Sequence, residues 1–198
     1  MDLLQFIDIL GTFVFAITGA IRGVDKKLDI FGIFVLSFLT SVGGGTIRDI
    51  LLNEVPFYFK KEYYVLPILG GVFFVLIFKR ISRYKDFLVY LDALGLGVFS
   101  VSGFDKAMSL NVGFLGSMIS GLITGIGGGI VRDALVREIP LVFRREIYAT
   151  ASLFGLLLFY ILGILHVQKS ISVWISVLAI FFTRVLCYRL GINLPRPR

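Results

Sequence analysis

The stretch Gly43-Gly44-Gly45-Thr46-Ile47-Arg48-Asp49 recurs 84 residues later as Gly127-Gly128-Gly129-Ile130-Val131-Arg132-Asp133. Sliding the chain on itself by this offset aligns the two halves without a gap, and roughly a third of the positions across the first two-thirds of the unit are identical. Chance would not place a Gly-Gly-Gly-x-x-Arg-Asp motif in register. The chain therefore contains two copies of one unit.

The similarity extends to both sides of this motif. Asp8 aligns with Asp92 and Phe15 with Phe99, each in an apolar stretch. Further identical pairs under the same offset are Gly11 and Gly95, Gly19 and Gly103, Gly32 and Gly116, Glu54 and Glu138, Pro56 and Pro140, and Tyr64 and Tyr148.

The composition is that of a protein built for a lipid environment. The chain has 198 residues, of which 57% are hydrophobic and 17% charged, and its mean hydropathy is +0.92. A soluble domain of this length covers its core with more charge. The net charge of +7 comes from short loops between apolar runs, which favours a membrane topology signal over a nucleic-acid surface.

Apolar runs long enough to cross a bilayer predict an all-α membrane protein of seven transmembrane helices in a single domain, 1–198. The expected spans are 3–21, 30–58 (interrupted), 63–79, 87–104, 112–142 (interrupted), 147–166 and 171–190. The first three-helix repeat covers 3–85 and the second covers 87–168. Because three is odd, the second repeat enters from the opposite side and is inverted. The seventh helix, 171–190, is expected to be a scaffold.

The distribution of lysine and arginine predicts the orientation. The first, third and fifth loops and the C-terminus carry most of these residues, which are retained on the cytoplasmic side. We therefore expect a multi-pass cell-membrane protein with its N-terminus outside and its C-terminus in the cytoplasm. The densest basic cluster either holds anionic lipid head groups or is only the topology signal; its residues are Lys79, Arg80, Arg83 and Lys85.

The glycine triplets predict discontinuities in two spans. Three consecutive glycines disfavour a helix and leave backbone groups free, and such groups in a bilayer must face protein or water. Breaks at matching places in inverted halves indicate a pore near the midplane, lined by Gly43, Gly44, Gly45, Gly127, Gly128 and Gly129. The alternative is that the glycines only permit close helix packing.

Four charged residues follow the triplets: Arg48, Asp49, Arg132 and Asp133. Neighbours along a helix do not face each other, so symmetry predicts crossed pairs in which Arg48 meets Asp133 and Arg132 meets Asp49. These charges would line the pore. The alternative is that each reaches the membrane surface from the end of its span.

A helical stripe of an acid, two glycines and a phenylalanine occurs in each repeat, as Asp8, Gly11, Phe15 and Gly19 and again 84 residues later. It predicts a pore with acidic mouths at Asp8 and Asp92 and a hydrophobic constriction at Phe15 and Phe99. The alternative is tight helix packing, with the aspartate capping a helix start.

The sequence lacks the motifs of nucleotide-binding and catalytic sites. Neither glycine run is a dinucleotide fingerprint or a P-loop. His166 is the only histidine and Cys187 the only cysteine, so no His/Cys metal site or thiol dyad can be built. We expect no cofactor, no metal beyond transient monovalent cations, and no enzymatic activity.

Two Gly-Gly-Gly-x-x-Arg-Asp motifs in a seven-helix chain of this length resemble the prokaryotic trimeric intracellular cation (TRIC) channels. The resemblance covers essentially the whole chain. It implies a homotrimer with a potassium-permeable pore in each protomer, and second and fifth helices that bend at the triplets beside the first and fourth. The Lys-Glu-Val motif that links animal members to phosphoinositides is absent, so that regulation is not implied.

The sequence thus predicts a monovalent cation channel. The expected partners are two further copies of the chain, membrane lipids, K⁺ and also Na⁺, and no nucleic acid. Bacterial relatives in this family are often labelled glycine transporters, so the first alternative is a secondary transporter of a small zwitterion such as glycine. The second is a membrane enzyme acting on lipid phosphates through Arg48 and Arg132, for which no nucleophile and base are evident.

Overall fold

The computed structural model describes residues 3–78, 85–144 and 147–192, and this part of the chain is helical without strands. The long helices are α1 (Leu3–Asp25), α2 (Ile30–Leu51), α4 (Val65–Ile77), α5 (Lys85–Ser109), α6 (Phe114–Leu135), α8 (Ala149–Ile164) and α9 (Lys169–Leu190). The short elements are α3 (Phe57–Lys60), the 3₁₀ helix η1 (Glu62–Tyr64) and α7 (Leu141–Arg144).

The seven long helices overlap the seven predicted apolar segments, and the all-α membrane class is confirmed, whereas the number of membrane crossings stays a prediction. Five of them, α1, α2, α5, α6 and α9, are long and apolar enough to cross a bilayer. The other two, α4 and α8, are shorter apolar helices of 13 and 16 residues. At about 1.5 Å per residue they span about 20–24 Å, less than a hydrocarbon core of about 30 Å.

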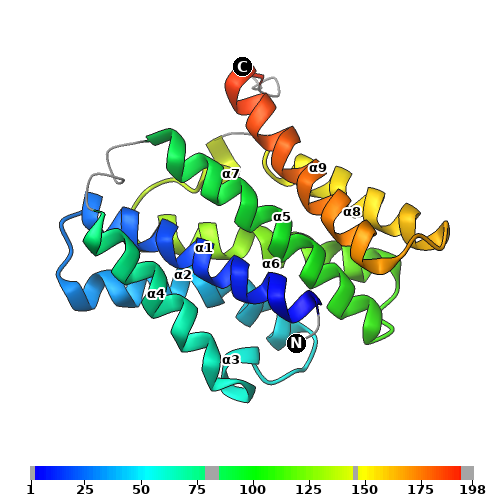
Figure 1. Cartoon of the computed structure of the whole chain (residues 1–198), viewed down its shortest axis with the longest axis horizontal. Coiled ribbons are helices and arrows are strands. Elements are labelled where there is room, and N and C mark those ends of the chain that lie inside the picture. Colours follow the sequence, from blue (N-terminus) through cyan, green and yellow to red (C-terminus); the bar gives the residue numbers. More distant parts are fainter. Residues whose placement is uncertain (1–2, 79–84, 145–146, 193–198) are drawn as a thin grey trace.

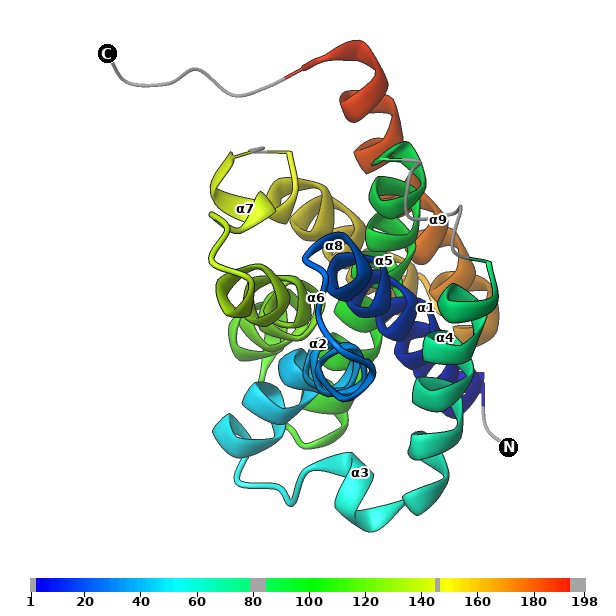
Figure 2. The ribbon, with the colours of Figure 1, turned by 90° about the vertical axis from the view of Figure 1, so that its left-hand side faces the viewer.

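Four helices form the centre of the molecule. α1 lies beside α5, and α2 lies beside α6 behind that pair (Figure 1). α4 packs on α1 at one flank, whereas α9 packs on both α5 and α8 at the other. The view after a quarter turn separates α2 and α6 from the layer of α1 and α4 (Figure 2). The start of α1 and the end of α9 lie at opposite ends of the bundle (Figure 1).

Contacts between matching helices show that the two repeats run in opposite directions. A methyl group added to Gly11 of α1 would meet the Phe99 ring of α5, and one added to Gly95 of α5 would meet the Phe15 ring of α1. The residue number rises on one helix as it falls on the other, so the helices are antiparallel. The predicted inversion of the repeat is thereby confirmed; the boundaries 3–85 and 87–168 stay a prediction.

The predicted helix breaks at the glycine triplets are wrong. α2 continues as an α-helix through 43–45, and α6 continues through 127–129. The interruptions occur later, at 52–56 and 136–140, where each chain segment ends in proline before a short helix. Each long helix ends in a left-handed residue, Asn53 with φ 55° and Arg137 with φ 58°, and the amides of these residues and of the glutamates that follow bond back to the last turn. Within the triplets, the weak helix propensity of glycine is offset by close packing.

The seventh long helix, α9, packs against glycines of its two neighbours, α5 and α8. A methyl group on Gly97 of α5 would lie 2.9 Å from the Val177 carbonyl oxygen, and one on Gly155 of α8 would lie 2.1 Å from Ile180 Cγ1. Val177 and Ile180 are fully buried. The middle of α9 is therefore packed tightly into the groove between α5 and α8.

Candidate functional site

The two triplets lie where α2 crosses α6. A methyl group on Gly44 would lie 2.1 Å from the carbonyl oxygen of Thr124, and one on Gly128 would lie 2.3 Å from that of Thr40. These two contacts are related by the 84-residue offset. Small residues allow this approach of backbone to backbone, so the packing role of the glycines is what the structure shows.

The third glycine of each triplet faces away from this crossing. Gly45 lies under the Phe57 ring, whose nearest atom would be 2.6 Å from an added methyl group. A methyl group on Gly129 would instead lie 3.2 Å from the Tyr148 hydroxyl, 3.7 Å from Asp92 Oδ1 and 3.8 Å from Arg132 Nη2. Gly129 therefore borders a group of buried polar atoms.

Phe15 and Phe99 meet at the centre of the four-helix core. Their ring centroids are 5.1 Å apart with an interplanar angle of 65°, an edge-to-face contact. Both rings are buried, and the Phe15 ring lies against Gly95 and Gly128. The two aromatic rings fill the space that the glycines leave between α1, α5 and α6.

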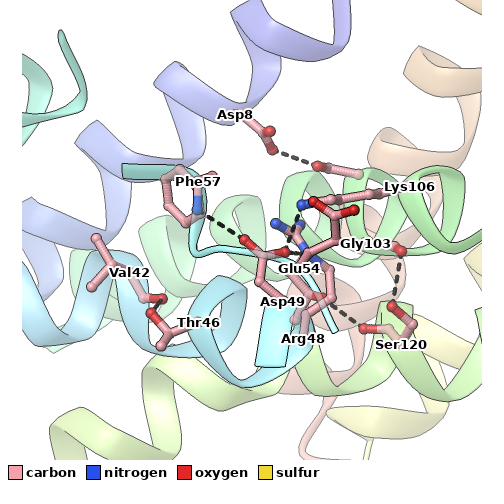
Figure 3. A network of polar contacts seen from close by, with 12 residues as sticks. Asp8, Val42, Thr46, Arg48, Asp49, Glu54, Phe57, Gly103, Lys106 and Ser120 are labelled. Carbon is pink, nitrogen blue, oxygen red and sulfur yellow. Dashed lines mark hydrogen bonds and ion pairs between the residues drawn. The ribbon is translucent and has the colours of Figure 1, made fainter. Parts of the chain in front are cut away.

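One buried polar cluster lies near the start of α1 and the ends of α2 and α5 (Figure 3). Asp49 Oδ1 accepts from Arg48 Nε and from Lys106 Nζ, each at 2.7 Å, and Asp49 Oδ2 accepts from the Phe57 amide at 2.9 Å. Asp8 accepts a hydrogen bond from the Ser102 hydroxyl. We call Asp8, Arg48, Asp49 and Lys106 the first cluster.

The other repeat carries a matching group at the opposite end of the core. Asp133 Oδ1 accepts from Arg132 Nε at 2.8 Å, and Asp133 Oδ2 accepts from the Leu141 amide at 3.1 Å. Arg132 also donates through Nη1 to Asp92 Oδ1 at 2.9 Å. Asp92, Arg132 and Asp133 are at most 1% exposed, and we call them the second cluster.

The predicted crossed pairs between the repeats are wrong. Arg48 pairs with Asp49 and Arg132 pairs with Asp133, the adjacent residue in each case. Adjacent side chains diverge at Cβ, but the arginine stem is long enough to curl back so that Nε reaches the carboxylate. The surface-snorkelling alternative is wrong too, since Arg48 is 3% exposed and Arg132 fully buried.

Each buried aspartate also fixes the loop that follows its helix. Asp49 accepts from the first amide of α3, and Asp133 accepts from the first amide of α7. A carboxylate at a helix start satisfies an otherwise free amide and opposes the helix dipole. The Arg-Asp dipeptide thus joins the end of a long helix to the start of a short one in both repeats.

Three residues in or beside the clusters were not predicted from the sequence. No site role was predicted for Lys106, and Tyr148 was only an aligned position of the repeat. Arg184 lies in the last third of α9 and is 2% exposed, with its guanidinium carbon 4.6 Å from the centre of the Tyr148 ring. An arginine inside an apolar span is itself a functional signal, and it could have been found.

Ion pairs outside the core tie the loops together. Arg22 and Lys26 contact Glu138 at 3.4 and 2.7 Å, so the end of α1 is bound to the loop after α6. On the loop after α2, the hydrogen bond from Lys60 at 2.5 Å lowers the pKa of Glu54. The predicted lipid contacts Lys79, Arg80 and Arg83, and the side chain of Lys85, lie outside the described residues.

The donor set of the clusters does not suit a resident metal. In the described part of the chain no three His, Cys, Asp or Glu side chains converge on one point. Each buried aspartate instead faces an arginine or a lysine, whose positive charge opposes a bound cation.

Comparison with known families agrees with the repeat. The family model described as "Glycine transporter" matches residues 5–80 and, separately, 89–163. Each match falls on one of the two units.

Individual proteins of known sequence or structure are similar over most of the chain. The chain is 41% identical to the UPF0126 inner membrane protein YadS of Escherichia coli K12, over 83% of this chain and 77% of that one. It is 36% identical to the TRIC trimeric intracellular cation channel orthologue from Rhodobacter sphaeroides, with a TM-score of 0.91 over 97% and 100% of the chains. A second TRIC cation channel structure gives 35% identity and a TM-score of 0.86 over 100% and 98%.

Proposed function

Because the chain belongs to the bacterial membrane-protein family that these glycine-transporter, UPF0126 and TRIC relatives represent, we propose that it conducts monovalent cations through a pore within each protomer. Potassium is the expected permeant ion, with sodium as a further candidate. The proposal assigns no catalytic chemistry to the chain. It assumes that the chain crosses the membrane several times, with its N-terminus outside and its C-terminus in the cytoplasm, as the lysine and arginine bias predicts.

One observation carries this proposal. Two largely buried polar clusters, each with an Arg-Asp pair and a further aspartate at equivalent positions of the repeat, lie at opposite ends of the core, and the Phe15–Phe99 contact lies between them. Asp8 and Asp92 each precede their phenylalanine by seven residues on a helix, which corresponds to about 10 Å. Buried charges inside a membrane protein mark solute pathways, so this line of polar, aromatic and polar groups is the proposed conduction path.

The aromatic contact would form the gate of this path. Phe15 and Phe99 pack edge to face, and Phe15 also rests on two glycine backbones. A narrow apolar constriction excludes water and ions until it widens. The described conformation therefore corresponds to a closed pore, which opens when the two rings separate.

Planar-bilayer recording of the purified protein under a potassium gradient tests the proposal. Phe15→Ala is expected to raise the open probability several-fold, because it removes one of the two rings at the constriction. Phe13→Ala is the matched control: Phe13 is on the same helix, but its ring packs on Phe74 of α4, away from Phe99. Absence of single-channel steps from the wild-type protein would refute the channel.

The name of the matching family model favours a second candidate, a transporter of glycine. The void bounded by Gly129, Asp133, Leu141 and Tyr148 has no room for a water molecule, so a glycine beside the second cluster would require rearrangement. Saturable, ion-coupled uptake of labelled glycine into proteoliposomes, without single-channel steps, would establish the transporter instead.

The assembly proposed is a homotrimer in contact with membrane lipids. The solved relative from Rhodobacter sphaeroides is described as trimeric, and this chain covers its full length. Mass measurement of the detergent-solubilised protein by light scattering checks the number of chains. If the protein conducts ions but is a monomer or a dimer, the proposal of a pore within each protomer stands and the proposal of a trimer is wrong.

A further inference from the structure

Arg184 is a buried charge that the repeat does not account for. It lies on α9, the helix without a counterpart in either unit, and is 2% exposed. Within the described part of the chain, its Nε and Nη2 atoms have no hydrogen-bond partner and no carboxylate pairs with it. A charge in a membrane interior without an ion pair is costly, so its presence calls for a role other than packing.

The packing of α9 places Arg184 beside the second cluster. Ile180 lies opposite Gly97 of α5, whereas Tyr188 donates to Asp86 of α5 at 2.6 Å. The two helices are thus antiparallel, and Arg184, midway between Ile180 and Tyr188, falls at the level of Asp92.

Tyr148 links this arginine to the cluster. The guanidinium carbon of Arg184 lies 4.6 Å from the centre of the Tyr148 ring, a cation–π contact. The Tyr148 hydroxyl lies beside Asp92 and Arg132 next to Gly129, and it interacts electrostatically with Asp92, Arg132 and Arg184. Arg132 Nη2 and Asp92 Oδ2 also lack partners among the described residues, so the cluster has unsatisfied polar atoms.

The second cluster has as many bases as acids, like the first, only when Arg184 is counted with it. The first cluster has two acids, Asp8 and Asp49, and two bases, Arg48 and Lys106. The second has two acids, Asp92 and Asp133, and one base, Arg132.

The repeat does not supply the missing base. The counterpart of Lys106 under the 84-residue offset is Arg22, which pairs with Glu138 outside the core. We propose that Arg184 of the seventh helix is the fourth charge of the second cluster and that it determines how readily cations enter the pore from the C-terminal side.

This inference rests on the proposed channel. A fixed positive charge beside one mouth lowers the local concentration of cations and therefore the current carried from that side. Lys106 does the same at the other mouth. The seventh helix is then a part of the conduction machinery, in contrast to the scaffold that the sequence predicts.

Oriented single-channel recording in symmetrical KCl tests this role, with the side of the C-terminus identified by proteolysis of a terminal tag. Arg184→Gln is expected to raise the current of cations entering from the C-terminal side at least about twofold relative to the opposite current, since a unit charge about 10 Å away changes ion occupancy by that factor even in water. Lys106→Gln is expected to shift the ratio in the opposite direction, and Arg184→Lys to keep it at the wild-type value.

Arg184→Met is measured in parallel, because an apolar chain of similar length replaces an unpaired buried charge without unsatisfied donors. It is expected to behave as Arg184→Gln does. A current ratio unchanged in both neutral variants, with the wild-type protein conducting, would overturn the role of Arg184 alone. A silent wild-type protein would overturn the proposed channel and this inference with it.

Discussion

Replacing Gly44 by alanine tests the helix crossing on which the core depends. The added methyl group would lie 2.1 Å from the Thr124 carbonyl oxygen, where an ordinary contact begins at 3.4 Å. The helices α2 and α6 would therefore have to separate by 3.4 − 2.1 = 1.3 Å. The obstructing atom is backbone and has no rotamer to adopt, so the whole displacement falls on helix packing.

The energetic result is a balance of two effects. Overpacking costs up to about 3 kcal/mol, whereas alanine favours the helix by about 1 kcal/mol over glycine. The expected net loss is about 2 kcal/mol, which lowers the midpoint of thermal unfolding by about 4–8 °C in a protein of this size. The same separation of α2 and α6 would also make room for the methyl group of Gly128→Ala. The double variant should therefore lose less stability than the sum of the losses of the two single variants.

Size-exclusion chromatography after heating, monitored by the fluorescence of Trp174, measures the midpoint in detergent. Gly163→Ala is the control, because this glycine of α8 has open space where a methyl group would go. It should unfold at the wild-type temperature or slightly above. A Gly44→Ala variant as stable as Gly163→Ala would show that the close crossing is not needed, and the packing role of the triplets would have to be abandoned.

Three further predictions concern charged residues. Asp49→Asn should lower stability by about 3–5 kcal/mol in chemical unfolding, because it removes the carboxylate that pairs with the buried Arg48 and with the partly exposed Lys106, whereas Glu54→Gln at the surface should change stability little; equal losses would contradict this. A double-mutant cycle should couple Arg132 to Asp92 by more than about 1 kcal/mol and leave Arg132 additive with Asp49, and the reverse pattern would restore the crossed pairing. Lys60 lowers the folded-state pKa of Glu54, so this ion pair stabilises the fold above the unfolded pKa of about 4.3, and the stabilisation is lost as the pH falls through the folded pKa. Below a pH of about 4.3 the melting temperature of Glu54→Gln should therefore depend less on pH than that of the wild-type protein. Melting temperatures of the two proteins that fall in parallel would argue against the pair.

The positions of the helices followed from the sequence because they depend on local composition. A run of apolar residues of bilayer length has to be helical, since lipid offers its backbone no hydrogen-bond partner. The doubled motif and the odd number of helices per unit then required an inverted pair. The contact of Phe15 with Phe99 was likewise foreseeable, because residues related by the two-fold relation meet where matching helices cross.

The behaviour of the glycine triplets was not foreseeable from local propensity. Three glycines weaken a helix by an amount that packing can offset, and whether it does depends on how closely α2 and α6 approach. The contacts of Gly44 with Thr124 and of Gly128 with Thr40 exist only in the assembled core. The helices end instead beyond the triplets, in left-handed turns at Asn53 and Arg137, and Pro56 and Pro140 directly precede the short helices α3 and α7.

The sequence by itself determined the repeat, the inversion and the positions of the long apolar helices, and it singled out the aspartates, arginines and phenylalanines of the two repeats as candidate site residues. Only the tertiary structure decided the partner of each charge: Arg48 turns back to Asp49, Lys106 joins it from α5, and Arg184 lies over the Tyr148 ring from outside the repeat. The reason is one of distance. Helix formation is decided over a few residues of sequence, whereas an ion pair is decided by side-chain reach of a few ångströms between helices that are remote in the chain.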